Sequence, residues 1–361
     1  MGIRLTDTTR LLLSLYIPSM VMSFGQGMVV PTVPVLATHF EVSVGLAAQI
    51  VTAQLLGRVI ILIPAGVLID RLGRRPMLIA GPVVIAAGAL ITALSPNFWV
   101  LLAAQVVIGA GNNLWQTARE IAAIDLVRPE QRGRLLSGFM GMGSVGMSIG
   151  PLLGGWMTQS FGFHTVFWAY AAMGVATLFI SFTIPETAAR VRSANPSAFS
   201  IGGLKDIDPY WRPTFIALIF NSFAAFMRSS MANAMLPLYA GSMLGYSPVE
   251  VGTLFTAMGI VNFIMIVPTG VISDSWGRKA VVVPSAVFGT LAFLGIPLFQ
   301  DLLPLVLLSG LLGLSNGLGL GTMASYSYDV IPPEARGRMQ AFRRTIGETG
   351  GVLGPMAGGL Y

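Results

Sequence analysis

The chain has 361 residues, of which 54% are apolar and only 10% are charged, against roughly 25% charged residues in soluble domains. Its mean hydropathy of +0.76 indicates a membrane protein, and its net charge of +6 does not indicate nucleic-acid binding, because the basic residues punctuate long apolar runs and form no single patch. Cysteine is absent, which excludes disulfides, and His39 and His164 lie far apart in the sequence and fit no metal-site spacing. We expect no metal and no cofactor.

Apolar runs predict eleven membrane spans, each close to the roughly 20 residues that a span requires. The first six lie near 11–36, 46–69, 77–94, 99–122, 136–158 and 164–184, and the other five near 213–239, 249–272, 280–298, 303–327 and 340–361. We therefore predict an all-α polytopic membrane protein. Its N-terminal six-helix bundle occupies 1–184, a central cytoplasmic linker occupies 185–212, and an incomplete C-terminal bundle occupies 213–361.

The basic residues predict the orientation of these spans. With the N-terminus in the cytoplasm, all but three of the 21 lysines and arginines fall on the cytoplasmic side. The first span is too long for the apolar core of a signal peptide, so we interpret it as a retained helix. The sequence thus predicts an integral protein of the plasma (inner) membrane with a cytoplasmic N-terminus.

Two parts of the chain read almost alike. The segment from Gly66 to Arg75 resembles the segment from Gly270 to Lys279, which begins 204 residues later, and the same offset carries Asp125 onto Asp329. A constant offset indicates an internal duplication with no net insertion. Many membrane transporters are built from two such repeats, with the substrate site at the interface between them.

The duplicated motifs resemble those of the major facilitator superfamily. The turn motif consists of Asp70, Arg71, Gly73, Arg74 and Arg75, and it returns as Asp274, Gly277 and Arg278. A second motif consists of Gly146, Gly150, Pro151, Gly154 and Gly155, is similar to that of twelve-helix drug/proton antiporters, and returns as Gly350, Gly354, Pro355, Gly358 and Gly359. One departure is Gln105, where antiporters of this type usually carry an arginine.

The resemblance implies two six-helix bundles related by a pseudo-two-fold axis along the membrane normal. It also implies alternating access driven by an ion gradient, which we expect to be one of protons. The span at 164–184 would have its counterpart near 368–388. We therefore expect the sequence to be a C-terminally truncated form of a twelve-helix protein.

The turn motifs suggest conformational latches on the cytoplasmic side. Asp70 and Asp125 would hold the arginines of the first turn, and Asp274, Arg278 and Asp329 would form the equivalent latch in the second half. The alternative is that these arginines only set the topology. The Gly-Pro motifs combine close helix packing with a bend at proline, which suits two halves that rock against each other.

Polar residues within the spans are the candidates for the translocation cavity. Gln105, Gly109, Asn112, Gln116 and Arg119 share one face of a helix, and they either line a cavity or form hydrogen bonds between helices. Arg58 lies about 18 Å from the inner end of its span by helix rise, and Arg228 is central in another span. Each marks either a substrate pathway or a structural pair within one half.

Two carboxylates within the spans are candidates for proton coupling. Glu348 lies about 15 Å deep and is the only deep acid available to Arg228, although it could equally pair with Arg344. Glu120 follows Arg119 and is the weaker candidate, because it suits a structural ion pair.

The sequence predicts a secondary active transporter and not an enzyme. It contains no phosphate-binding Gly-x-x-x-x-Gly-Lys-Ser/Thr loop and no His-Glu-x-x-His pairing. The favoured function is proton-coupled efflux of amphipathic or drug-like molecules. The alternatives are ion-coupled transport of a polar or anionic metabolite and, in a different class, a transporter-like receptor that does not transport. Expected partners are a small-molecule substrate, the proton and the lipid bilayer, and we expect a monomer.

Overall fold

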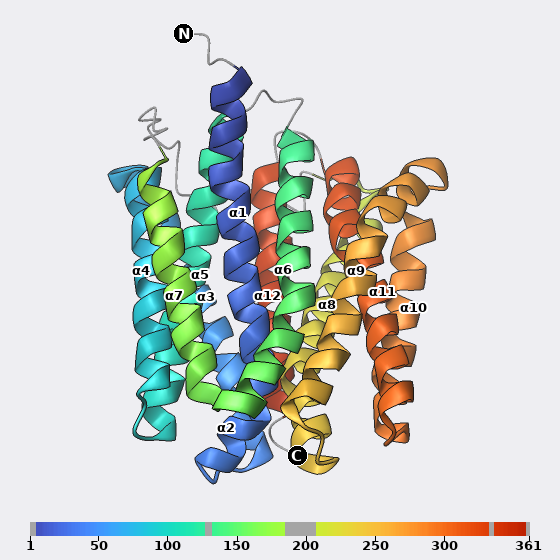
Figure 1. The fold of residues 1–361 in the computed structure, drawn as a ribbon. Coiled ribbons are helices and arrows are strands. Elements are labelled where there is room, and N and C mark those ends of the chain that lie inside the picture. The colour runs from blue at the N-terminus through green and yellow to red at the C-terminus, as the bar shows by residue number, and fades with distance from the viewer. Residues whose placement is uncertain (1–4, 127–131, 185–206, 332–335, 359–361) are drawn as a thin grey trace. The chain divides into compact units, whose positions relative to one another are not determined.

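The computed structural model describes residues 5–126, 132–184, 207–331 and 336–358, which form helices and turns with no strand among them. The helices of the N-terminal half are α1 (Leu5–Val29), η1 (Val30–Thr32), α2 (Val33–His39), α3 (Val44–Leu72), α4 (Arg74–Ala93), α5 (Phe98–Leu126), α6 (Arg132–Phe161) and α7 (Phe163–Phe182). Those that follow are α8 (Arg212–Leu238), η4 (Tyr239–Met243), α9 (Pro248–Ser275), α10 (Lys279–Gly295), η5 (Ile296–Leu298), α11 (Leu302–Val330) and α12 (Arg336–Gly358) (Figure 1). The all-α prediction is confirmed.

Each predicted span corresponds to a long helix in the described part of the chain. The first span is divided into α1, η1 and α2, because Pro31 and Pro34 lack the backbone N–H that a continuous helix needs. Nine helical segments of the described residues are long and apolar enough to cross a membrane. The two predicted spans that are not among them are α6 and α12, both of which begin with arginines.

Contacts within the chain divide it into two units. The first comprises Met1–Arg192 with Pro237–Thr256, and the second comprises Ser193–Leu236 with Ala257–Tyr361. These units differ from the predicted bundles mainly in the segment Pro237–Thr256. That segment groups with the first unit because the start of α9 packs against α6, and η4 packs against α2.

Within the first unit, α1 packs against α6 and α7, while α5 packs against α3 and α4. Within the second unit, α11 packs against α10 and contacts α12. Ile207 is buried against α8 and the end of α11, so the last residues of the predicted linker belong to the core of this unit.

Glycine makes the duplicated turns possible. Gly73 ends α3 with φ of 96°, and Gly277 follows α9 with φ of 88°. This left-handed region favours glycine, which has no Cβ to clash with the backbone. The repeated glycine therefore lets each half place arginines directly after a tight turn.

Candidate functional site

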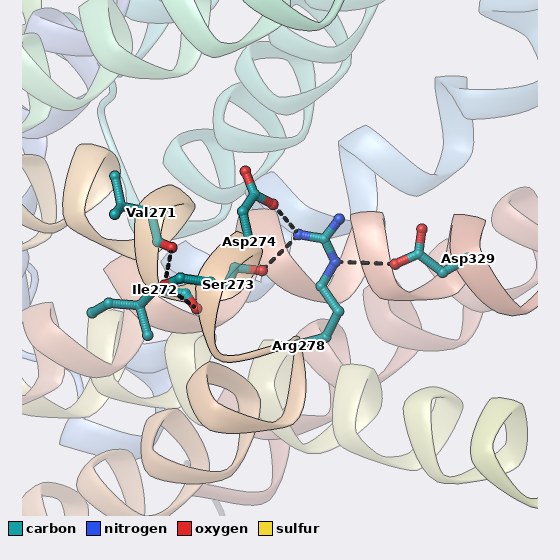
Figure 2. A network of polar contacts seen from close by, with 7 residues as sticks. Val271, Ile272, Ser273, Asp274, Arg278 and Asp329 are labelled. Atoms are coloured by element: carbon teal, nitrogen blue, oxygen red, sulfur yellow. Dashed lines mark hydrogen bonds and ion pairs between the residues drawn. The ribbon is translucent and has the colours of Figure 1, made fainter.

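Arg278 is the centre of a polar network in the second unit (Figure 2). Its Nη1 donates to Oδ1 of Asp274 at 2.9 Å and to Oγ of Ser273 at 2.7 Å, while its Nε donates to Oδ2 of Asp329 at 3.0 Å. Hydrogen bonding to Asp329 raises the pKa of Arg278 above its ordinary value. An arginine with a raised pKa loses its positive charge only in strong alkali. The network therefore keeps its cation throughout the physiological pH range. The three residues predicted as a latch are thus brought together.

The equivalent residues of the first unit are described only in part. Asp70 and Asp125 lie on α3 and α5, but their side chains fall outside the described residues. Arg75 donates from Nη2 to the carbonyl oxygen of Phe182 at 3.2 Å, which ties the start of α4 to the end of α7. Arg71 is exposed, and Arg74 is partly buried.

The N-terminal part of the α5 polar face, which carries Gln105 and Asn112, forms hydrogen bonds between helices. Gln105 is fully buried, accepts from Nε2 of Gln54 on α3 at 2.5 Å and donates to Oγ1 of Thr92 on α4 at 3.2 Å. Asn112 accepts from Nε2 of Gln26 on α1 at 2.8 Å and donates to the hydroxyl of Tyr170 on α7 at 3.1 Å. The interhelical alternative therefore accounts for both side chains.

At the C-terminal end of this face, Arg119 also has partners inside the first unit. Arg119 is buried, donates from Nη1 to Oγ of Ser19 at 2.7 Å and lies 4.8 Å from the ring centroid of Trp115. Glu120 lies 3.8 Å from Arg119, a loose ion pair. Gln116 is half-buried. Sequence reasoning did not identify Ser19, because a lone serine in an apolar span carries no distinguishing pattern.

The two arginines that lie deep in spans differ in their surroundings. Arg58 on α3 makes no hydrogen bond or ion pair with any described residue, and its Nε is buried without a partner. Arg228 on α8 donates from Nη2 to Oγ of Ser315 at 2.7 Å, and its guanidinium fills the space that a side chain at Gly289 would occupy. Ser315 is fixed in turn by reciprocal hydrogen bonds with Ser285.

Glu348 pairs with its own helix and not with Arg228. Its Oε1 lies 3.8 Å from Nε of Arg344, one turn earlier on α12, and its side chain is 18% exposed. Of the two pairings that the sequence allowed for Glu348, the structure contains the local one.

The Gly-Pro motif gives α6 two close contacts. A Cβ added at Gly146, Gly150 or Gly154 would collide with the backbone of α1, whereas one at Gly155 would collide with the backbone of Pro248 on α9. The second copy faces α8 through Gly350 and Gly354, whose added Cβ atoms would meet the carbonyl oxygens of Phe223 and Met227. Gly358 packs against Met235, and Gly359 lies outside the described residues. Pro151 and Pro355 lie inside α6 and α12.

The two histidines, distant in the sequence, meet in the first unit. The ring centroids of His39 and His164 are 5.9 Å apart beside Phe163, and Nδ1 of His164 donates to the carbonyl oxygen of Ala93 at 2.7 Å. A search of the described residues finds no group of three metal-ligating side chains. The two exposed histidines thus form an aromatic contact.

Long apolar helices, a duplicated glycine turn and polar side chains deep within spans define a membrane transporter built from two related halves. The chain belongs to the Major Facilitator Superfamily, whose family model matches residues 15–355. It is 25% identical over 332 residues to the multidrug resistance protein MdtH of Yersinia pestis (strain Pestoides F), covering 90% of this chain and 81% of that protein. MdtH of Yersinia pseudotuberculosis serotype O:1b matches equally.

Solved structures show the same fold. The inward-facing, unoccupied structure of a bacterial homologue of the human lysosomal transporter Spinster has a TM-score of 0.78 at 15% identity, covering 99% of this chain and 83% of that one. The nucleoside transporter NupG has a TM-score of 0.79 at 14% identity, covering 97% and 91%. At these identities the comparison establishes the fold alone. The protein is a transporter of this superfamily.

Proposed function

We propose that this transporter exports amphipathic or drug-like small molecules by alternating access, in exchange for protons. We further propose that it works as a monomer in the plasma (inner) membrane with its N-terminus in the cytoplasm. The observation that carries the proposal is the match to a multidrug resistance protein over 90% of the chain. The Gly-Pro motif, through which α6 packs closely on both α1 and α9, supports it.

The contacts that would open and close are weak enough to break. Arg278, Asp274 and Asp329 are 29%, 75% and 53% exposed, and exposed ion pairs contribute about 0–1 kcal/mol each. A latch of that strength can favour one conformation without preventing the other. Tightly packed residues such as Gly155 would supply the opposing contact at the other end of the helices.

Glu348 is the proposed proton carrier. It lies within α12 and is mostly shielded, and its 3.8 Å separation from Arg344 exceeds hydrogen-bond length. A carboxylate held this loosely can exchange a proton as its surroundings become wet or dry. Glu120 is the weaker candidate, because its side chain is 40% exposed and it neighbours the buried Arg119.

An efflux assay tests the proposal. In a bacterial host that lacks its main efflux pumps, expression should lower the accumulation of at least one member of a panel of anionic, neutral and cationic amphipathic dyes, and a protonophore should restore it. Glu348→Gln should abolish proton-driven efflux while leaving dye exchange across de-energised membranes, and Glu120→Gln is the matched control that should retain both. Unchanged accumulation of a panel of cationic, neutral and anionic amphipaths would contradict efflux, and efflux that survives the protonophore would contradict proton coupling.

A further inference from the structure

Arg58 is a charge within a membrane span that has no counter-charge among the described residues. Its Nε is buried, yet the guanidinium makes no hydrogen bond or ion pair with any described side chain. An arginine at this depth is costly, and burying a donor without a partner adds to that cost. An ionisable side chain within a span therefore indicates a functional site, at which a ligand can supply the partner that the protein does not.

The backbone that carries Arg58 is held in place. The preceding residue, Gly57, lies so close to α5 that an added Cβ would collide with the carbonyl oxygen of Val106. Gly109 on α5 makes the reciprocal contact with the backbone of Gln54, and the Gln54 side chain is bonded to Gln105. Arg58 therefore projects from a helix that packs closely on α5 at the two positions, Gln54 and Gly57, that come just before it.

The polar groups near Arg58 are neutral and bonded to one another. Its charge acts on the hydroxyl of Tyr170, which belongs to the chain of hydrogen bonds from Gln26 through Asn112. None of these groups carries a negative charge. Glu120 is the one described carboxylate within the spans of the N-terminal half, and it is paired with Arg119. The charge that would complement Arg58 must come from outside the described chain.

We propose that Arg58 binds an anionic group, such as a carboxylate, on an amphipathic cargo. The inference rests on the proposed function and narrows its substrate class. A guanidinium presents two parallel N–H donors that match the two oxygens of a carboxylate. The Gln26–Asn112–Tyr170 chain provides neutral polar groups beside it, so an anion is attracted without competition from an acidic side chain.

Arg228 provides the matched comparison within the same protein. It also lies deep in a span, and its Nε is likewise buried without a hydrogen-bond partner, but its Nη2 donates to Ser315 and its guanidinium is packed over Gly289. Its contacts connect α8 with α10 and α11 inside the second unit. It therefore holds helices together, whereas Arg58 makes no such connection.

Equilibrium binding to the purified full chain in detergent tests the proposal. The probes are two matched sets of radiolabelled compounds: phenylbutyrate, phenylbutyramide and phenylbutylamine, and naphthylacetate, naphthylacetamide and naphthylethylamine. Wild-type protein should bind the carboxylates about tenfold or more tightly than the amides, and Arg58→Gln should remove that preference while leaving amide binding unchanged. Arg58→Lys should keep part of the preference, and Arg228→Gln should keep all of it.

Thermal unfolding separates this role from a structural one. Because the Arg58 charge has no partner among the described residues, Arg58→Gln should unfold at the wild-type temperature or above it, whereas a structural arginine would lower that temperature. Amides or amines that bind as tightly as carboxylates, or an Arg58→Gln variant that keeps the preference, would overturn the inference and leave amphipath transport intact. If wild-type protein binds no member of either set, both the inference and the proposed function fail.

Discussion

Arginine serves different purposes in this protein according to its neighbours. Arg278, at the edge of a turn, holds two carboxylates. Arg228 is packed against glycine and serine inside the second unit, and Arg58 has no partner among the described residues. The residue type alone therefore does not indicate the role, because the counter-charge and the packing decide it.

In each half, a buried arginine donates a hydrogen bond to a serine on the first helix of that half. Arg119 on α5 donates to Ser19 on α1, and Arg343 on α12 donates from Nη1 to Oγ of Ser222 on α8 at 2.6 Å. Ser19 and Ser222 occupy comparable positions on the first helix of each half, and each also donates to a backbone carbonyl four residues earlier. The arginines come from helices that are not related by the duplication. The two halves therefore form the same arginine–serine contact with arginines from different helices.

The Arg278 network makes a prediction about its two acids. Asp329→Asn should impair transport more than Asp274→Asn, because Asp329 connects α10 to α11 whereas Asp274 lies four residues away on the adjoining turn. Each variant should lower the free energy of unfolding by no more than about 1 kcal/mol, since both acids are exposed. Initial transport rates and thermal unfolding of the purified variants test this. Equal, wild-type rates would mean that the turn only sets the topology.

The crossing of α3 and α5 makes a prediction about glycine. Gly109→Ala should destabilise the protein by about 1–3 kcal/mol, because the added methyl group meets the backbone of Gln54. Gly66→Ala on α3 is the control. A Cβ there has nothing within 4 Å, and alanine is favoured over glycine in a helix by about 1 kcal/mol. Thermal unfolding in detergent should therefore move in opposite directions, and a shared direction would mean that the crossing is looser than described.

At the scale of elements, α9 has a distinctive position. It is one continuous helix from Pro248 to Ser275, yet the division between the two units falls after Thr256. Its first turns pack on α6, where Gly252 and Gly155 allow the two backbones to touch. One helix therefore contributes residues to both units.

Packing between α6 and α9 can be tested with one methyl group. Gly155→Ala should disfavour the state in which the helices touch by about 1–3 kcal/mol, a shift of roughly 5- to 150-fold. Transport should fall while membrane insertion is unchanged. Gly141→Ala on the same helix is the control, since an added Cβ there meets nothing within 4 Å. Equal transport by both variants would remove α6 from the conformational cycle.

At the scale of the whole molecule, the chain combines duplication with divergence. Gly73 and Gly277 keep the same backbone conformation 204 residues apart, and the Gly-Pro motif packs on the first helix of its half in both copies. Gly155 packs on α9, outside the first helix of its half. The backbone conformation of the turn and the packing of the Gly-Pro motif on the first helix were thus retained in both copies.

The absence of cysteine allows the predicted orientation to be tested directly. Ser275→Cys, in a turn predicted to be cytoplasmic, should react with a membrane-impermeant maleimide only after the cells are permeabilised. Asp301→Cys, at the start of α11, should react in intact cells, and both positions are exposed. The reverse pattern would contradict the cytoplasmic N-terminus that the distribution of lysine and arginine predicts.

The amino-acid sequence by itself determined the helical spans, their duplication and the positions of the repeated turns. Lipid leaves the backbone no alternative to internal hydrogen bonding, so an apolar run of sufficient length is enough to specify a spanning helix. The glycine turns were equally predictable from the sequence, because Gly73 and Gly277 occupy a backbone region that other residues avoid. The Gly-Pro motif predicted close helix packing for the same steric reason.

Only the tertiary structure decided which polar groups satisfy one another. The period of α5 placed Gln105 and Asn112 on one face, but their partners Gln54 and Tyr170 come from helices whose rotation the sequence does not reveal. The same holds for Arg228, which meets Ser315 and not Glu348. Hydrogen bonds form over about 3 Å, whereas helical periodicity fixes a side chain only to one side of a cylinder some 10 Å wide. Pairing is therefore set by how the helices pack.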